Sequence, residues 1–353
     1  MKMGFMVYRF ILMLFLLPQA LLAEPFNAHK IPPQALESFY KAFHKIHPKG
    51  RIQKVTSLRG ESIDHVFKIS VLEDRPHTYF VRFLNRKNKN LNHEKIKITQ
   101  AMAGIWHGPD VIIYAHDFKS FITDFIQGRH LSPSDLKDPV LFKNFVDKLK
   151  QSHEYLKTID QDFFLTYCMG QRTLSRLSEI EDRSIILPNI EKASKVLIRL
   201  KDNQEPARQV VHNDVRPENI ILDEKGVPHL IDWAEITIGN IFDDLGAFAE
   251  FFDLSPLSEE SLIKQYFNKD ASSANLALLK IHRWSNGLHR AAFKFRKYLD
   301  AIGDDKPTSW KDALNSDNQD LKKAASRLKS YLEKVDKVDF KRSLEKAGFS
   351  IHI

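Results

Sequence analysis

The chain has 353 residues, of which 43% are hydrophobic and 28% are charged. This is the composition of a globular protein, and the length is enough for two domains with a hydrophobic core each. The 13 glycines, 15 prolines and 25 phenylalanines exclude collagen-like, low-complexity and disordered chains. The formal net charge of +8 indicates an anionic ligand only weakly, and the single cysteine, Cys168, excludes a disulfide framework and a zinc site with several cysteines.

Residues 1–23 have the pattern of a secretory signal peptide. Lys2 and Arg9 are followed by an uninterrupted apolar run, residues 10–17, and the segment ends in small residues at Ala23. The run is too short to span a bilayer, which takes about 20 apolar residues. The alternative is an amphipathic or buried N-terminal helix. If the segment is a signal, the protein is exported or membrane-associated without a stable membrane span; otherwise it is cytoplasmic.

Residues 24–127 are predicted to form a β-rich lobe with one helix. Segments that mix β-branched and aromatic residues predict strands over 53–58, 65–72, 78–84, 111–114 and 121–126. A helical stretch over 91–102 separates the first three strands from the last two. This order indicates a small antiparallel sheet with one inserted helix.

Residues 128–353 are predicted to form a larger, mainly α-helical lobe. Ser132 and Pro133 are a helix start signal, and an apolar stripe follows from Leu141 to Leu156. The clearest amphipathic stripe runs from Leu278 to Leu299. Short apolar runs follow at 210–211, 220–222 and 229–231. Residues 304–320 are predicted to form a polar loop and residues 321–337 a surface helix. The expected fold class is therefore α+β.

The residues that carry chemistry are concentrated between Val210 and Phe251. His212 and Asp214 follow one apolar run, Asn219 precedes the next, and Asp232 follows the third. Phosphoryl transfer requires neutralised phosphates and an oriented hydroxyl, and Mg²⁺ prefers hard oxygen ligands. An Asp and an Asn from opposite sides of a turn can supply those ligands, and a further Asp can accept the hydroxyl proton. The alternative is a β-hairpin that carries solvated acids.

In this context the stretch resembles the choline kinase and aminoglycoside phosphotransferase superfamily, the small-molecule relatives of protein kinases. The family pattern is His-x-Asp, four residues and Asn, then Ile-Asp-Trp or Ile-Asp-Phe, and it matches His212, Asp214, Asn219 and Asp232. The resemblance implies a protein-kinase-like fold of two lobes. It implies that Asp214 is the catalytic base, that Asn219 and Asp232 bind magnesium, and that His212 supports the loop. Asp244 matches the residue that braces this region from the start of a helix.

The resemblance extends to the nucleotide-binding side of the first lobe. Arg82 corresponds to the strand residue that clamps the ATP phosphates, with Glu94 on the following helix as its partner. Gly60 and Ser62 lie in the matching phosphate-covering loop, which has one glycine where relatives often have two. For all four residues the alternative is structural: solvated charges for Arg82 and Glu94, and a plain turn for the loop.

Residues 122–128 resemble the hinge whose backbone would hold adenine, and Asp124 and Ile126 are its candidate contacts. An ordinary edge strand with a turn would have the same pattern.

Relatives that bind choline enclose its quaternary ammonium group with aromatic faces and carboxylates, and this pattern indicates which residues could contact the acceptor. Ala234 stands where choline kinases usually have Glu, and Trp284 also belongs to the amphipathic stripe, so core packing is its alternative. The candidates for contact with the acceptor are Trp233, Glu235, Asp244, Trp284 and His289, with Glu250 and Asp253 as further sources of negative charge.

The sequence therefore predicts an ATP- and Mg²⁺-dependent phosphotransferase that acts on a hydroxyl of a small, amine-bearing molecule, choline-like, ethanolamine-like or aminoglycoside-like. The expected partner is this small-molecule acceptor, and nucleic acid is excluded because no groove-reading motif is present. The oligomeric state stays open. The alternative is an exported pseudokinase that serves as a binding module, because compartments outside the cytoplasm hold little ATP.

Overall fold

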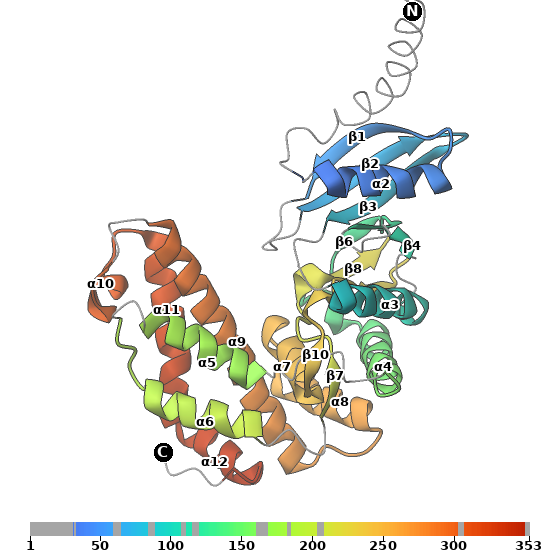
Figure 1. The fold of residues 1–353 in the computed structure, drawn as a ribbon. Coiled ribbons are helices and arrows are strands. Elements are labelled where there is room, and N and C mark those ends of the chain that lie inside the picture. The colour runs from blue at the N-terminus through green and yellow to red at the C-terminus, as the bar shows by residue number, and fades with distance from the viewer. Residues whose placement is uncertain are drawn as a thin grey trace, which may run out of the picture. The chain divides into compact units, whose positions relative to one another are not determined.

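The computed structural model describes residues 31, 33–58, 65–83, 89–106, 111–114, 120–159, 169–181, 185–202, 208–302 and 307–349. The chain forms two compact units that divide between Gln127 and Gly128 (Figure 1). The segment predicted to be a signal, residues 1–23, lies outside the described residues. No helix in the described ranges has the length and apolar character needed to cross a membrane.

The first unit is built on a five-stranded antiparallel sheet with the strand order β1-β2-β3-β5-β4. One face of the sheet is apolar, because alternate residues such as Phe67, Ile69 and Val81 are fully buried. Helix α2 (Pro33–Ile46) packs on this face through Phe39 and Phe43. The other elements are β1 (Arg51–Ser57), β2 (His65–Leu72), β3 (Pro76–Phe83), α3 (Lys89–Trp106), β4 (Val111–Tyr114) and β5 (Ser120–Asp124).

The second unit is mainly helical. Helix α9 is central to it, since α5, α7, α11 and α12 all pack against it, and α5 and α6 run beside one another (Figure 1). Its apolar stripe supplies Ile281, Trp284, Leu288 and Phe295 to the main hydrophobic core. The helices are α4 (Pro139–Leu156), α5 (Met169–Glu181), α6 (Ile190–Asp202), α7 (Ile241–Phe251), α8 (Pro256–Phe267), α9 (Ser273–Ala301), α10 (Trp310–Leu314), α11 (Gln319–Glu333) and α12 (Val338–Lys346).

Two small antiparallel sheets complete the second unit. One has the order β6-β8-β9, and in the other β10 pairs with β7. Their strands are β6 (Gly128–His130), β7 (Arg208–Val211), β8 (Ile220–Asp223), β9 (Pro228–Leu230) and β10 (Thr237–Asn240). The expected α+β fold, a small antiparallel sheet followed by a larger helical region, is confirmed.

The predicted helix start at Ser132 and Pro133 is wrong, because α4 begins at Pro139. The side chain of Asp138 caps α4 by accepting hydrogen bonds from the backbone N–H groups of Val140 and Leu141, with proline in the first turn. The hydroxyl of Ser132 is bound by Asp135 instead. Two Ser/Asp-Pro pairs therefore compete for the helix start, and the second pair caps it.

Helices α7 and α9 cross in close contact at Gly246. A Cβ atom at this position would lie 2.7 Å from the backbone N of Arg283 and from the carbonyl carbon of His282. We therefore expect Gly246→Ala to lower the free energy of unfolding by about 1–3 kcal/mol, because backbone atoms cannot move aside locally. Urea denaturation measures this. Gly104→Ala in α3 is the matched control, since nothing lies within 4 Å of a Cβ atom there. Equal stability of the two variants would contradict the prediction.

Candidate active site

Two antiparallel pairings bring together the polar segments that the sequence singled out. In the β8–β9 hairpin Ile220 pairs with Leu230, so Asn219 and Ile231 lie side by side, and the Ile231 N–H donates to the Asn219 carbonyl at 2.9 Å. In the second pairing Val211 opposes Thr237, which places the start of the 212–219 loop beside the 231–236 turn. Asp232 is thereby carried to the loop that contains Asp214.

The carboxylate of Asp214 is held by hydrogen bonds at Oδ2. The amide Nδ2 of Asn219 donates to Oδ2 at 2.6 Å and to the Asp214 carbonyl at 2.9 Å, and Nε of Arg216 donates to Oδ2 at 3.1 Å. Burial raises the pKa of Asp214, and the nearby charge of Asp232 raises it further, against the opposing effect of Arg216, His212 and Asn219. A carboxylate with a raised pKa is a stronger proton acceptor than a solvated one.

His212 ties the two segments together. Its Nε2 lies 3.0 Å from the carbonyl oxygen of Ile231, and its Nδ1 lies 3.2 Å from the backbone N–H of Asp214. A carbonyl can only accept and a backbone N–H can only donate, so Nε2 donates to the Ile231 carbonyl and Nδ1 accepts from the Asp214 N–H. The ring also packs edge-on against Trp233 at 4.5 Å between centroids. His212 therefore positions both Asp214 and the residue that precedes Asp232.

Two residues of the site have left-handed backbone conformations. Asn213 has φ 67° and Asp232 has φ 61°. Asn and Asp adopt this conformation more readily than other residues with a side chain, but it still costs free energy that the surroundings must offset. These conformations fall on the residue before Asp214 and on Asp232 itself, so the fold selects a particular backbone geometry in both segments.

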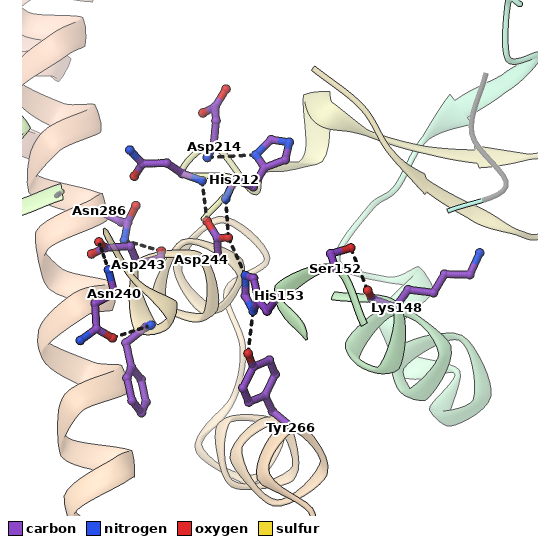
Figure 2. Close-up of polar contacts among 12 residues, drawn as sticks. Lys148, Ser152, His153, His212, Asp214, Asn240, Asp243, Asp244, Tyr266 and Asn286 are labelled. Carbon is purple, nitrogen blue, oxygen red and sulfur yellow. Dashed lines mark hydrogen bonds and ion pairs between the residues drawn. The ribbon is translucent and has the colours of Figure 1, made fainter. Parts of the chain in front are cut away.

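Asp244 holds the 212–219 loop from the first turn of α7. Its fully buried carboxylate accepts hydrogen bonds from the backbone N–H groups of His212 at 2.8 Å and Asn213 at 2.6 Å, and from Nε2 of His153 at 2.9 Å (Figure 2). Burial by itself would raise the pKa of Asp244, but His153, His212 and the Asn213 N–H outweigh it and hold the pKa below its ordinary value. The charge is thus stabilised where it binds the loop.

His153 on α4 extends this brace to α8. Its Nδ1 lies 2.6 Å from the hydroxyl of Tyr266. Burial raises the pKa of Tyr266, so the hydroxyl keeps its proton and donates to Nδ1, which leaves the Nε2 proton for Asp244. The loop, α7, α4 and α8 are therefore connected by one chain of hydrogen bonds.

The neighbouring Asp243 anchors α7 to α9. Its carboxylate lies 2.8 Å from Nδ1 of His282, and its carbonyl accepts from the side-chain amide of Asn286 at 3.0 Å (Figure 2 draws the Asn286 contact). Asn240 and Asp243 also form a capping box at the start of α7. In it, each side chain accepts a hydrogen bond from the backbone N–H of the other residue. The first turn of α7 is therefore held by α9 and by its own capping box.

Asn219 and Asp232 fit the requirements of a magnesium site. Both hydrogen bonds of the Asn219 amide use Nδ2, so its amide oxygen is the atom that can ligate a cation. The carboxylates of Asp214 and Asp232 repel each other, which a divalent cation would relieve. In the described ranges no three His, Cys, Asp or Glu residues gather as a metal cage. A Mg²⁺ held here would take its remaining ligands from phosphate and water.

The aromatic candidates for the acceptor side are buried. Trp233 is 4% exposed and donates its indole N–H to the Leu230 carbonyl at 3.3 Å. Trp284 is 2% exposed, belongs to the main core and donates to the Tyr331 carbonyl at 2.9 Å. Glu235 is partly exposed and pairs with Arg172 at 3.0 Å. Asp244, counted with this group from the sequence, is wholly occupied by the brace described above.

The nucleotide-side candidates lie in the first unit. Arg82 is buried on β3, opposite Val66 on one side and Phe121 on the other. Asp124 ends β5 in an exposed position, and Ile126 follows it half-buried. Glu94 belongs to α3, but its side chain lies outside the described residues, as do Gly60 and Ser62 altogether.

Two residues that contact the candidate site were not predicted from the sequence. His153 lies 91 positions from Asp244, and no local pattern connects them. Arg172 on α5 reaches the carbonyl of Asn213 and the carboxylate of Glu235, again across a long stretch of chain. Only the three-dimensional packing reveals either contact.

The fold is shared with known small-molecule kinases. A choline/ethanolamine kinase family protein from Mesorhizobium loti superposes with a TM-score of 0.60 at 17% identity, covering 83% of this chain and 92% of that one. Choline kinase LicA from Streptococcus pneumoniae gives 0.56 at 18% identity, covering 84% and 99%. LicA in complex with AMP gives 0.50 at 18%, covering 82% and 96%. A thermostable mutant of aminoglycoside phosphotransferase APH(4)-Ia gives 0.51 at 13%, covering 84% and 98%.

At these identities the likeness shows a common fold. No curated protein matches the sequence. The model of the phosphotransferase enzyme family, by contrast, matches residues 55–277, which is more than half of the chain and includes the whole site from His212 to Asp244. The chain therefore belongs to the phosphotransferase enzyme family, and it is a small-molecule kinase.

Proposed function

We propose that this kinase transfers the γ-phosphoryl group of ATP to a hydroxyl of its acceptor, with Asp214 as the catalytic base. The observation that carries the proposal is the contact between Asp214 and Asn219, whose Nδ2 binds Oδ2 at 2.6 Å. One amide thereby orients the base and presents its own oxygen as a metal ligand. The choice of nucleotide is supported by the fold shared with LicA, which has been solved with AMP.

The chain's own residues account for the proton transfer. Asn219 and Arg216 both bind Oδ2 of Asp214, so Oδ1 is the oxygen we assign to the acceptor hydroxyl. As the hydroxyl oxygen bonds to the γ-phosphorus, the bond to the ADP oxygen breaks and the hydroxyl proton passes to Oδ1. Mg²⁺ on Asn219 and Asp232 would supply charge neutralisation of the phosphates. Asp214 returns the proton to solvent after the product leaves.

We further propose that the first unit binds the nucleotide and the second supplies catalysis and the acceptor site. Arg82, a buried cation on β3, is the proposed phosphate clamp, with Glu94 as partner. Gly60 and Ser62 remain the proposed phosphate-covering contacts. Asp124 and Ile126 remain the proposed adenine contacts. No finding supports the pseudokinase alternative, and the proposed base and metal ligands are of the residue types that catalysis requires.

Replacing a magnesium ligand tests this proposal. Asp232→Asn keeps an oxygen but removes the charge, so we expect the Mg²⁺ concentration for half-maximal turnover to rise at least about 10-fold. ADP release by the full chain, measured across a Mg²⁺ series, gives this value. Asp339→Asn is the control, because that carboxylate is 95% exposed on α12. An unchanged Mg²⁺ requirement in Asp232→Asn would remove Asp232 from the metal site.

A further inference from the structure

Arg172, on α5, contacts both segments of the candidate active site with one side chain. Its Nη1 donates to the carbonyl of Asn213 at 3.5 Å, a long hydrogen bond, and its Nη2 donates to the carboxylate of Glu235 at 3.0 Å. Asn213 directly precedes the proposed base, and Glu235 follows the proposed metal ligand Asp232 by three positions. A guanidinium group is planar and rigid, so its two contacts restrain the two segments relative to one another.

The contact with the Asn213 carbonyl influences how the backbone enters Asp214. The N–H of Asn213 donates to Asp244 at 2.6 Å while its carbonyl accepts from Arg172, so this residue is held through both of its backbone groups. In the peptide unit that joins Asn213 to Asp214, the N–H donates to Nδ1 of His212 at 3.2 Å. Because a peptide unit is planar, contacts at its oxygen and at its nitrogen together fix its orientation. Arg172 therefore helps to set the direction of the backbone at the proposed base.

The contact with Glu235 acts on the segment that carries Asp232. Glu235 ends the short 3-10 helix η5 (Trp233–Glu235), which begins directly after Asp232. Asp232 has φ 61° and Asn213 has φ 67°, so each segment contains a left-handed residue whose conformation neighbouring contacts must stabilise. Arg172 contributes such a contact to each of the two segments.

The helix that carries Arg172 is anchored in the second unit. Helix α5 packs against α6 and α9, and Met169 and Thr173 are buried in it. A Cβ atom at Gly170 would lie 2.7 Å from the carbonyl oxygen of Leu197 on α6, so the two helices touch through their backbones two residues before Arg172. A side chain carried on an anchored helix is placed more precisely than one carried on a loop.

The alternative is an ion pair that has no effect on the reaction. The side chain of Arg172 is 16% exposed and that of Glu235 is 38% exposed, and a partly exposed pair contributes little to stability. Removal of such a pair would change neither the stability nor the turnover appreciably. Its position between the two segments favours an effect on turnover, because misplacing a reacting group by about 1 Å can lower a rate by about 100-fold.

We propose that Arg172 is a positioning residue of this kinase, which binds the Asn213 carbonyl and the Glu235 carboxylate and thereby sets the spacing between Asp214 and Asp232. This inference rests on the proposed function, because that function assigns the base and the metal ligand that Arg172 positions. It also gives Glu235 a role in the framework of the site in place of the acceptor contact predicted from the sequence.

Hydrolysis of ATP tests the effect on the reaction, because water takes the place of the acceptor. Mg²⁺-dependent release of phosphate by the full chain gives kcat and the KM for ATP. We expect Arg172→Gln to lower kcat by about 10–100-fold and to leave the KM for ATP little changed, since the first unit is proposed to bind the nucleotide. Arg172→Lys keeps the charge but lacks the planar fork, so it should restore part of the lost kcat.

Arg176→Gln is the matched control on the same helix. Arg176 lies one turn after Arg172 and pairs with Glu179 of α5 at 3.1 Å, so the variant loses the same charge and an ion pair. Its kcat should stay close to that of the wild type, and the urea midpoints of both glutamine variants should stay close as well. Wild-type kcat in Arg172→Gln, or an equal loss in Arg176→Gln, would overturn the proposal. If the urea midpoint shows that Arg172→Gln does not fold, Arg172→Lys takes its place, and full kcat in that variant would overturn the proposal.

Hydrogen exchange gives a second readout that does not depend on activity. The backbone N–H groups of residues 211–216 are followed by mass spectrometry in the full chain without nucleotide. This segment should exchange faster in Arg172→Gln than in the wild type, because its peptide unit loses a contact, and it should exchange at the wild-type rate in Arg176→Gln. Equal exchange in all three chains would contradict a role of Arg172 in holding the loop.

Asp214→Ala in the same hydrolysis assay separates this proposal from the proposed function. If the wild type releases no phosphate, or if Asp214→Ala keeps full turnover, the result counts against the proposed function, and hydrogen exchange alone decides whether Arg172 positions the loop. If Asp214→Ala is inactive while Arg172→Gln keeps the kcat of the wild type, the positioning role fails and the proposed function stands.

Discussion

Asp214→Ala is expected to lower turnover by about 10²–10⁴-fold, the usual contribution of a general base. The variant removes the only group in our mechanism that accepts the hydroxyl proton, and it releases Asn219 Nδ2 from its 2.6 Å hydrogen bond. Nucleotide binding is expected to change far less, because Asp214 is not assigned to it. Acceptor-dependent ADP release and nucleotide affinity, measured side by side, separate the two effects.

Glu218→Gln is the matched control for this change. Glu218 is acidic and belongs to the same loop, but its side chain is exposed. We expect its turnover to stay close to that of the wild type, since exposed charges contribute little. Full activity in Asp214→Ala would remove Asp214 from the role of base. Equal losses in both variants would point to a general effect of loop charge.

The second large effect is expected from Asp244→Ala. The substitution leaves the backbone N–H groups of His212 and Asn213 and the ring of His153 without their acceptor in a buried place. Each buried donor left without an acceptor costs about 1–3 kcal/mol, so the free energy of unfolding should fall by at least about 3 kcal/mol. Turnover should also fall, because the strained backbone of Asn213 loses the contact that holds it. Urea denaturation and ADP release measure the two losses.

A double-mutant cycle isolates the brace from general damage to the core. Asp244→Asn, His153→Phe and the double variant should show losses that do not add, since the two side chains share the hydrogen bond from His153 Nε2 to the Asp244 carboxylate. Asp339→Asn on the surface should change the free energy of unfolding by no more than about 0.5 kcal/mol. Strictly additive losses in the cycle would contradict a direct role for the pair.

The lowered pKa of Asp244 adds a pH signature to the same variant. A carboxyl whose pKa is lower in the folded state stabilises the protein above its unfolded pKa and loses that contribution as the pH falls through the folded value. Below about pH 4, the free energy of unfolding should therefore fall less steeply with pH in Asp244→Asn than in the wild type. Equal slopes measured by denaturation at several pH values would contradict this assignment.

Much of the fold can be predicted because its signals are local. Strands β2 and β4 coincide with the predicted ranges 65–72 and 111–114, where β-branched and aromatic residues dominate. The stripe of α9 is recognisable because its apolar residues recur at helical spacing over many turns.

Two further elements were not predicted, and the reasons differ. Helix α2 has its apolar residues at helical spacing, so Phe39 and Phe43 carry a helical signal that the prediction of a β-rich lobe with one helix does not include. Strand β10 contains Gly239 and Asn240, which have low strand propensity, and it forms because β7 offers a pairing edge. Here the tertiary partner decides the structure, and sequence alone does not contain it.

The same division holds for the candidate site. His212, Asp214, Asn219 and Asp232 lie within a short stretch, so their joint occurrence is apparent from their spacing along the chain. The residues that set their geometry, above all His153 and Arg172, come from helices far away in sequence. Spacing can indicate which residues react, but the packing of helices determines how they are held.

The hydrogen-bond chain through Asp244 has a consequence for when the site can form during synthesis of the chain. Its links join residues 31, 32, 91 and 113 positions apart, so long loops must close before the catalytic loop acquires its shape. During synthesis, Asp214 leaves the ribosome well before Tyr266 does. A nascent chain that ends before α8 would therefore contain every reacting residue of the site and yet stay catalytically silent, and activity would begin only when α8 docks.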